Sequence, residues 1–243
     1  FIHELLDLLV RQKGSDLFIT ADFPPAIKVD GKITPVSKSS LTPQHTIELV
    51  RSVMNDKQAA EFESTKECNF AIAPPGIGRF RVNAFVQQGR VGLVLRTINT
   101  TIPKFEDLGL PPVLKDVIMS KRGIMLFVGA TGSGKSTSMS ALLGYRNDNS
   151  YGHIITIEDP IEFLIRDKRS IVNQREIGVD TNSFSTALRA ALRQDPDVIL
   201  VGEMRDFETI ETALMAAETG HLVMSTLHTL DATETINRII SVF

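Results

Sequence analysis

Apolar positions in the first part of the chain follow a helical period once and then change to the alternation of strands. Helical spacing before Gly14 predicts a short amphipathic helix with apolar residues at Ile2, Leu5, Leu6, Leu9 and Val10. Short runs then predict strands at 16–20, 26–29 and 32–36, and a β-rich stretch at 68–98. Asp30-Gly31 tolerates the positive φ of a tight turn, which predicts a hairpin. Thr42-Pro43 opens a further helix, so we expect a small α+β domain over residues 1–98.

From Pro111 onward, short apolar runs alternate with helical segments. This pattern predicts strands at 124–128, 153–157, 197–201 and 221–226, and helices from 135, at 183–193, at 206–218 and from 231. The alternation is typical of βαβ units around a mostly parallel sheet. We therefore expect an α/β domain over residues 111–243. The segment 99–110 has no sustained period and is interpreted as a linker.

The strand predicted at 124–128 leads directly into 129–136, Gly-Ala-Thr-Gly-Ser-Gly-Lys-Ser, which fits the phosphate-loop pattern G-x-x-x-x-G-K-[ST]. The glycines let backbone N–H groups turn inward around phosphates. Lys135 can reach the β- and γ-phosphates, and Ser136 can offer its hydroxyl to Mg²⁺. The helix that follows points the positive end of its dipole at the same anion. The alternative, a Gly-rich structural turn, is disfavoured by this strand-then-helix context.

Composition and charge narrow the class of protein. With 243 residues, 42% hydrophobic and 23% charged, the chain has an ordinary globular composition. It has neither an apolar run of membrane-spanning length nor a signal peptide, so we expect a cytoplasmic protein. Cys68 is the single cysteine, which excludes an internal disulfide and a multi-cysteine zinc site. A net charge of −3 argues against a protein that mainly grips nucleic acid. Phe1 and the uncapped helical spacing that runs to Phe243 indicate a piece of a longer protein.

Polar side chains follow the predicted strands after the phosphate loop, at the edge of such a sheet where ligands bind. Hydrolysis of ATP needs a metal ion, an oriented water and cations in that region. Each segment alone could be a solvated turn or a helix cap, but their order after the phosphate loop favours a site. The segments are 157–162, 197–203 and 225–229.

We interpret Glu158, Glu162 and Glu203 as catalytic carboxylates and His228 as a catalytic or sensing imidazole. Asp159 is weighed as equally suited to a solvated turn. His221 is interpreted as structural, because a zinc pair with His228 lacks further ligands. Gly precedes Glu203 where many phosphate-loop enzymes place Asp. The metal is therefore assigned to Ser136 and to waters held by Glu203.

Arginines recur away from the phosphate loop, at Arg79, Arg81, Arg96, Arg175, Arg189, Arg193, Arg205 and Arg238. A planar guanidinium is the usual cation for clamping a γ-phosphate from a neighbouring subunit. We expect Arg81, Arg96 and Arg193 to contact the nucleotide in this way. Alternation of Arg with apolar residues over 79–85 equally describes a half-exposed strand.

The block 192–206, Leu-Arg-Gln-Asp-Pro-Asp-Val-Ile-Leu-Val-Gly-Glu-Met-Arg-Asp, resembles the signature of the secretion-type ring ATPases of type II secretion, type IV pili and type IV secretion. The resemblance covers nearly the whole chain. It implies a RecA-like ATPase domain at 111–243, lacking a C-terminal helical part, behind a PAS-like domain at 1–98 that contributes Arg81 and Arg96. It also implies a Walker A loop at 129–137, an Asp box at 157–162, a Walker B strand at 197–203 and a His box at 221–228. The nucleotide contacts are then Gly129, Thr131, Gly132, Ser133, Gly134, Lys135, Ser136 and Thr137.

Within this family the sequence is similar to the pilus retraction branch, PilT and PilU, because the phosphate loop begins too early for a further N-terminal domain. The segments 129–131, 144–147 and 67–70 resemble PilU, whereas 174–176 and 202–206 occur in PilT as well. The resemblance implies a homo-hexamer that binds ATP and Mg²⁺ and assists pilus retraction at the inner face of the inner membrane. Its implied partners are an inner-membrane platform protein and a PilT-like paralogue.

Other interpretations of the sequence stay open. They are a primary retraction motor of the PilT type, a type II or type IV secretion ATPase, and a RecA-like nucleic-acid motor. The nucleic-acid motor predicts a basic channel, which the acidic balance opposes. A nucleotide-gated assembly module without catalysis is opposed by Lys135, Ser136, Glu162 and Glu203.

Overall fold

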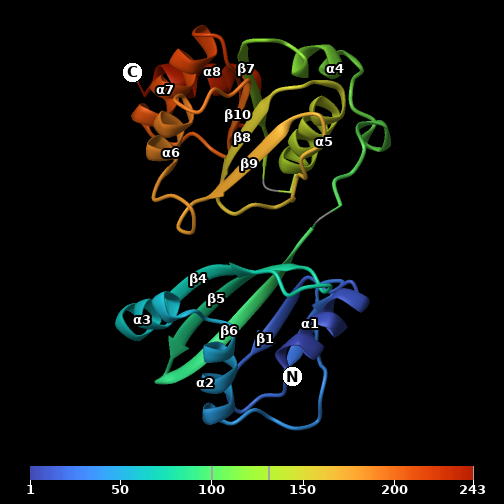
Figure 1. The fold of residues 1–243 in the computed structure, drawn as a ribbon, viewed down its shortest axis with the longest axis vertical. Coiled ribbons are helices and arrows are strands. Elements are labelled where there is room, and N and C mark those ends of the chain that lie inside the picture. The colour runs from blue at the N-terminus through green and yellow to red at the C-terminus, as the bar shows by residue number, and fades with distance from the viewer. Residues whose placement is uncertain (100, 131, 243) are drawn as a thin grey trace. The chain divides into compact units, whose positions relative to one another are not determined.

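The computed structural model describes residues 1–99, 101–130 and 132–242 (Figure 1). This part of the chain divides into two compact units, Phe1–Asn99 and Thr100–Phe243. No helix among the described residues is long and apolar enough to cross a membrane.

The first unit has an antiparallel sheet with helices on one face. Across the described residues its strand order is β3-β2-β1-β6-β5-β4. The strands are β1 (Asp16–Ile19), β2 (Ala26–Val29), β3 (Lys32–Pro35), β4 (Glu67–Ile72), β5 (Arg79–Gln87) and β6 (Arg90–Ile98). The helices are α1 (Ile2–Arg11), α2 (Pro43–Ser52) and α3 (Asp56–Thr65). Buried side chains of all three helices form one hydrophobic cluster with alternate residues of the strands, which leaves the other face of the sheet without helices of this unit.

Local sequence determines several of these elements. The predicted hairpin between β2 and β3 turns at Asp30 and Gly31, whose φ values are 48° and 79°. The same turn chemistry joins β5 to β6 through Gln88 and Gly89, at φ 49° and 73°. In β5, Phe80, Val82 and Ala84 are buried in the core, so the alternation predicted over this stretch is confirmed.

The second unit has a parallel sheet with helices on both faces, as predicted for this part of the chain. Its strand order, within the described residues, is β7-β11-β10-β8-β9. The strands are β7 (Gly123–Val128), β8 (His153–Glu158), β9 (Ile171–Glu176), β10 (Val198–Val201) and β11 (Leu222–Leu227). The helices are η1 (Phe105–Leu108), α4 (Val113–Ile118), α5 (Lys135–Asn149), α6 (Phe184–Ala191), α7 (Phe207–Glu218) and α8 (Ala232–Ile240).

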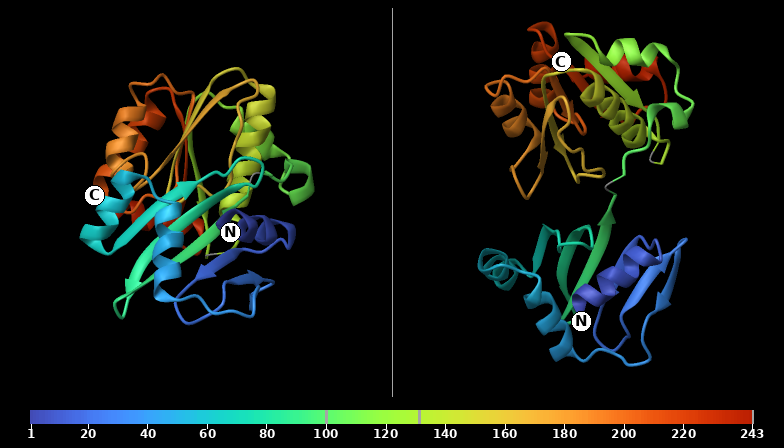
Figure 2. Two further views of the ribbon diagram at one scale, coloured as in Figure 1. Left: turned by 60° about the horizontal axis from the view of Figure 1, so that its bottom comes forward. Right: turned by 45° about the vertical axis from the view of Figure 1, so that its right-hand side comes forward.

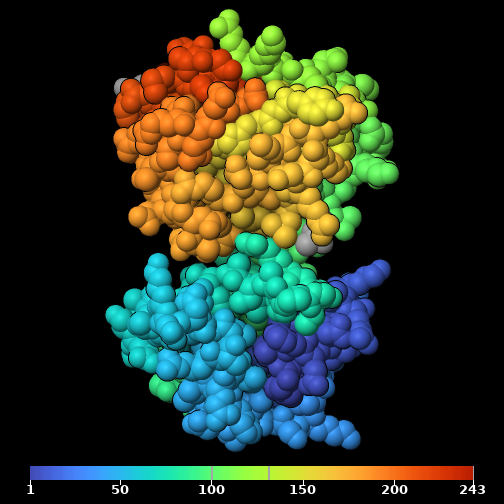
Figure 3. Space-filling model, in the orientation of Figure 1, coloured from blue at the N-terminus to red at the C-terminus, as the bar shows by residue number. Residues whose placement is uncertain are grey.

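Two hydrophobic clusters lie on opposite faces of this sheet. In β10, Val198 and Leu200 pack with α4 and α5, while Ile199 and Val201 pack with α6 and α7. Figure 2 shows the sheet between these two helical layers, and Figure 3 shows the surface of the molecule from the side of Figure 1. All four residues of β10 are buried, which explains its uninterrupted apolar sequence.

The structure also differs from the predictions. The strand β9 was not predicted, and it forms the edge of the parallel sheet beside β8. Part of the segment predicted as a linker is folded, because Phe105 in η1 is buried against Ile118 and tilted toward the ring of Tyr145. That half of 99–110 therefore belongs to the core of the second unit.

Candidate active site

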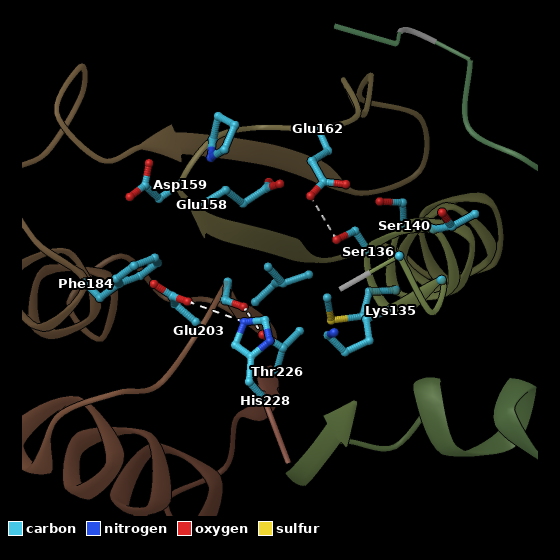
Figure 4. Close-up of a pocket in the computed structure, with 17 residues that line it drawn as sticks. Lys135, Ser136, Ser140, Glu158, Asp159, Glu162, Phe184, Glu203, Thr226 and His228 are labelled. Atoms are coloured by element: carbon cyan, nitrogen blue, oxygen red, sulfur yellow. Dashed lines mark hydrogen bonds and ion pairs between the residues drawn. The ribbon is translucent and has the colours of Figure 1, made fainter. Parts of the chain in front are cut away.

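The phosphate loop joins β7 to α5 and opens into a pocket at the carboxyl ends of the strands (Figure 4). Gly132 and Gly134 have φ values of 80° and 92°. Only glycine adopts this conformation readily, and it turns the loop around the space that phosphates would fill. Lys135 Nζ donates to the carbonyl oxygens of Gly129 and Ala130, at 2.7 and 2.8 Å. The ammonium group is thus held within the phosphate loop, where it is predicted to bind the phosphates.

Ser136 and Glu162 meet directly across this pocket. The Ser136 hydroxyl donates to Glu162 Oε1 at 3.1 Å, although the two residues come from the start of α5 and from the segment after β8. Figure 4 shows the Glu162 carboxylate directed at the hydroxyl. A serine hydroxyl that donates its proton in this way keeps its oxygen lone pairs for a cation. The pair therefore forms a polar corner with a hydroxyl and a carboxylate oxygen.

Glu158 lies beside this corner in a less hydrated place. Its Oε1 accepts hydrogen bonds from Thr156 Oγ1 at 2.5 Å and from Gln174 Nε2 at 3.1 Å. Burial raises the pKa of the Glu158 carboxyl, and the nearby charge of Glu162 raises it further, while the two side-chain hydrogen bonds act in the opposite direction. Desolvation is the largest of these effects and favours the protonated acid. Glu158 therefore differs chemically from Glu162, although both carboxylates line the pocket.

Glu203 enters the pocket from the tip of β10. Its Oε2 lies 2.8 Å from Arg205 Nη2 and 3.9 Å from His228 Nε2. The glycine before it is closely packed, because a Cβ on Gly202 would lie 3.1 Å from Ile157 O and 3.4 Å from Glu158 Cα. A side chain at this position requires the backbone of β8 to give by a few tenths of an ångström. This close packing favours Gly where many phosphate-loop enzymes have Asp.

The tip of β11 is tied to the tip of β10 by side-chain hydroxyls. Ser225 Oγ donates to Val201 O at 2.7 Å, and Thr226 Oγ1 donates to Gly202 O at 2.6 Å. Two residues later, His228 lines the pocket opposite Glu162. These bonds hold Glu203 and His228 in a fixed relation at adjacent strand ends.

The oxygen atoms of this pocket suit Mg²⁺ only together with a nucleotide. Among the residues that the structure describes, no group of three or more His, Cys, Asp or Glu side chains is arranged to hold a metal ion. Mg²⁺ commonly takes one or two protein oxygens and completes its shell with phosphate oxygens and water. The Ser136 hydroxyl, with Glu162 behind it and Glu203 across the pocket, fits that mode.

Most of the predicted site residues converge on this pocket. The predicted residues that line it are Gly132, Gly134, Lys135, Ser136, Thr137, Glu158, Glu162, Glu203 and His228, and Asp159 lines it as well. Gly129 and Ser133 belong to the loop but do not line the pocket. The predicted contact at Thr131 lies outside the described residues.

One part of the predicted Walker B strand lies elsewhere. Asp197 stands at the amino end of β10, so its side chain is at the sheet edge opposite the pocket. Its Oδ2 accepts from the backbone N–H of His153 at 2.8 Å. A Cβ on Gly152 would lie 2.5 Å from the same oxygen, so this glycine makes room for the carboxylate. Asp197 joins the starts of β8 and β10 and does not contribute to the site.

The comparison with known protein families agrees with this arrangement. The sequence model of the family described as "Type II/IV secretion system protein" matches residues 1–242. The chain belongs to this family.

Within the type II/IV secretion system protein family, the chain is similar to ATPases of type IV pili. It is 55% identical to the type IV pilus ATPase PilU of Pseudomonas aeruginosa over 99% of this chain and 63% of that protein. It is 51% identical to the retraction ATPase PilT of the same organism over 100% of this chain and 70% of that protein. The higher identity to PilU agrees with the predicted resemblance. The chain thus spans less than two thirds of the length of this PilU.

A solved structure of the family has the same fold. The pilus retraction motor PilT, crystallised with bound ADP, superposes with a TM-score of 0.95 at 49% identity, over 100% of this chain and 71% of that one. This likeness confirms the predicted fold class, a RecA-like domain with a mostly parallel sheet behind a small α+β domain.

Among the arginines expected to contact the nucleotide, Arg193 belongs to the second unit and does not line its pocket, whereas Arg81 and Arg96 belong to the first unit. Arg96 Nε donates to Asp16 Oδ1 at 2.9 Å, and Asp16 is only 4% exposed. Arg81 is half-buried in β5, and Arg193 is exposed after α6. A role for any of them at the nucleotide stays a prediction.

Sequence reasoning missed several residues of the pocket and its support. Phe184 lines the pocket, and Gln174 and Glu176 reach its walls from β9. Thr226, which also lines it, lies in the predicted segment 225–229. The segment Gln174-Arg175-Glu176 was identified by its resemblance to family members. Its position on a strand beside the site was not predicted, because its polar residues do not give the hydrophobic pattern of a strand.

Proposed function

We propose that this chain is the ATP-hydrolysing part of a PilU-like motor that drives or assists retraction of a type IV pilus. The observation that carries the proposal is the meeting of Lys135, the Ser136–Glu162 pair and Glu203 in one pocket next to a phosphate loop. The similarity to PilU and PilT supports the pilus as the object on which the protein works.

The residues divide the chemistry of phosphoryl transfer between them. Lys135 gives up its two loop carbonyls for the β- and γ-phosphates of ATP, which replaces neutral acceptors by charged ones. Ser136 holds Mg²⁺, while Glu162 accepts the hydroxyl proton of Ser136 and fixes its rotamer. Bound Mg²⁺ neutralises charge that develops on the phosphate oxygens.

The attacking water requires an acceptor on the open side of the γ-phosphate. Glu203 and Glu162 are both within the pocket, and Glu203 is further held by Arg205 and approached by His228. We assign the orientation of this water to Glu203, or to Glu162 where it is not engaged by Ser136. His228 contacts the same region and reports the loss of the γ-phosphate to β11.

The active form in this proposal is a homo-hexamer at the inner face of the inner membrane. It acts on an inner-membrane platform protein, alone or alongside a PilT-like paralogue. Deleting the gene, and separately that of the paralogue, and scoring pilus retraction in each strain tests this level of the proposal. Unchanged retraction in both strains, and in the double deletion, contradicts it.

The enzymatic level is tested by hydrolysis of ATP by the purified protein and by Lys135→Ala. Loss of the ammonium group removes the main side-chain cation for the phosphates, worth several kcal/mol in such sites. We expect turnover to fall below about a tenth of the wild-type rate, with an unchanged circular dichroism spectrum. A variant that keeps more than this activity contradicts the assigned site.

A further inference from the structure

The segment 159–165 carries Glu162 into the pocket between two anchored neighbours. Ile161 and Ile165 are buried, at 3% and 8% exposure, and they flank Glu162 on the two sides. The amides of both isoleucines must be bonded somewhere, because a buried N–H without a partner is costly. Both find their acceptors on side chains of β9, the edge strand beside β8 (Figure 1).

Glu176 holds the residue before Glu162. Its Oε2 accepts from the backbone N–H of Ile161 at 3.1 Å, and the Glu176 side chain is only 1% exposed. The backbone N–H of Glu176 is itself bonded to Asp180 Oδ2 at 2.9 Å. The carboxylate therefore belongs to a fixed strand end and receives the N–H of the loop.

Gln174 holds the residues after Glu162 and uses its whole amide to do so. Nε2 donates to Phe163 O at 2.9 Å and to Glu158 Oε1 at 3.1 Å, and Oε1 accepts from Ile165 N at 2.7 Å. A carbonyl can only accept and a backbone N–H can only donate, so these partners define one orientation of the amide. Gln174 thus links the segment to a carboxylate that lines the pocket.

We propose that Gln174 and Glu176 are positioning residues that set the place of the Glu162 carboxylate relative to Ser136. The inference rests on the proposed function, since it matters only if Glu162 takes part in hydrolysis. Neither side chain lines the pocket, so neither needs to touch the nucleotide. A misplacement of about 1 Å in such a group can cost about 10²-fold in rate with little effect on binding.

Substitutions at the two positions separate positioning from general stability. Gln174→Met keeps the length of the side chain but removes all three hydrogen bonds, and Glu176→Leu removes the acceptor for Ile161. Glu176→Gln keeps an acceptor oxygen and serves as the conservative variant. Asn173→Ala is the matched control, because Asn173 lies on the opposite face of β9 and bonds His153 Nε2 at 2.7 Å.

The experiment measures ATP turnover, affinity for a fluorescent ATP analogue and amide hydrogen exchange of 159–165 in the full-length protein. We expect Gln174→Met and Glu176→Leu to lower kcat at least about tenfold, to change affinity by less than about threefold, and to speed exchange in this segment. Glu176→Gln restores most of the kcat that Glu176→Leu loses, and Asn173→Ala leaves all three quantities unchanged.

Three results overturn the inference. The first is a kcat within about twofold of wild type in both disruptive variants. The second is a loss of kcat that parallels a loss of affinity or of the whole fold, and the third is no rescue by Glu176→Gln. Glu162→Gln is measured in the same series to separate the two proposals. If Glu162→Gln has normal turnover, the proposed role of Glu162 fails, whereas a slow Glu162→Gln beside fast Gln174→Met and Glu176→Leu rejects only the positioning role.

Discussion

Individual carboxylates in the pocket differ because their surroundings differ. Glu158 is the most dehydrated, and its pKa is raised, while Glu162 faces a serine hydroxyl and Glu203 faces an arginine. Residues of one chemical type thus occupy three environments within one pocket. Their roles in hydrolysis are expected to separate accordingly.

Glu162→Gln and Glu203→Gln are expected to bind ATP and to hydrolyse it slowly. The phosphates are bound mainly by the loop and Lys135. Replacing a carboxylate by an amide is therefore expected to change the affinity for ATP only slightly. We predict a fall in turnover of at least about 10²-fold for each variant. Binding of a fluorescent nucleotide and single-turnover hydrolysis measure the two properties. Loss of nucleotide binding in both variants would show that these carboxylates contribute to binding instead of to hydrolysis.

Glycine substitutions test the packing around the tip of β10. Gly202→Ala forces a methyl group against the backbone of β8, with contacts of 3.1 and 3.4 Å, and we expect it to lower the unfolding free energy by about 1–3 kcal/mol. Turnover should fall as well, because Glu203 is the next residue.

Gly144→Ala is the matched control for this prediction. Gly144 lies within α5, and a Cβ there would lie 3.7 Å from Ile102 Cγ2, which is ordinary contact. Replacing a helical glycine by alanine is expected to stabilise by about 0.5–1 kcal/mol. Thermal unfolding of both variants tests whether Gly202→Ala destabilises the protein and Gly144→Ala stabilises it. A Gly202→Ala protein as stable as wild type contradicts the steric account of the missing Asp.

At the level of elements, the sequence predicted those strands and helices whose own hydrophobic pattern is enough to identify them. Strand β10 was found because all four of its residues are buried and apolar. Strand β9 was missed because Asn173 to Glu176 are polar. The side chains of Gln174 and Glu176 form hydrogen bonds to the segment 159–165. Such a strand is specified by its partners, which one-dimensional periodicity cannot display.

The same limit applies to the site. Carboxylates at strand tips could be predicted, because parallel strands bring their carboxyl ends to one edge. Asp197, the first residue of the segment matched to Walker B, lies before the amino end of β10, and its contact with the N–H of His153 could not be predicted from the sequence. Arg96 was assigned to nucleotide binding, and its contact with Asp16 across the β1–β6 pair could not be read from residues that lie far apart in the sequence.

The start of α7 offers a test at the scale of one helix. Asp206 caps this helix, with Oδ1 accepting from Thr209 N at 2.9 Å and Oδ2 accepting from Thr209 Oγ1 at 2.8 Å. We predict that Asp206→Ala lowers the unfolding free energy by about 0.5–2 kcal/mol, because it leaves the backbone N–H of Thr209 without its acceptor. Asp206→Asn keeps the cap and should change stability much less. Equal losses in the two variants, measured by urea unfolding, would reject the capping role.

For the whole molecule, the arginines outside the phosphate loop predict activity that depends on assembly. If Arg81, Arg96 or Arg193 completes a site on another subunit, stabilisation of transition-state charge is worth about 10³-fold or more in rate. Turnover per subunit should then rise with protein concentration in parallel with ring formation. ATPase rates alongside mass measurement in solution test this expectation, with Arg81→Ala, Arg96→Ala and Arg193→Ala as separate variants.

The Arg96 variant needs its own control. Arg96 is bonded to the buried Asp16, so Arg96→Ala leaves a carboxylate without its cation and is expected to weaken the first unit. Arg96→Ala combined with Asp16→Asn removes that charge and isolates any effect on hydrolysis. Full activity in a demonstrated monomer, or unchanged turnover in all three single variants, would return these arginines to ordinary ion pairs.

The two hydroxyl bonds between β10 and β11 have a consequence for the distribution of stiffness around the pocket. The wall that holds Glu203 and His228 continues the hydrogen-bonded sheet to its last residues. The wall that holds Glu162 is a loop tethered by side chains of an edge strand. Regions with such tethers open at lower free energy than the interior of a sheet. We therefore expect local opening of the pocket to be easier on the Glu162 side than on the wall formed by the ends of β10 and β11.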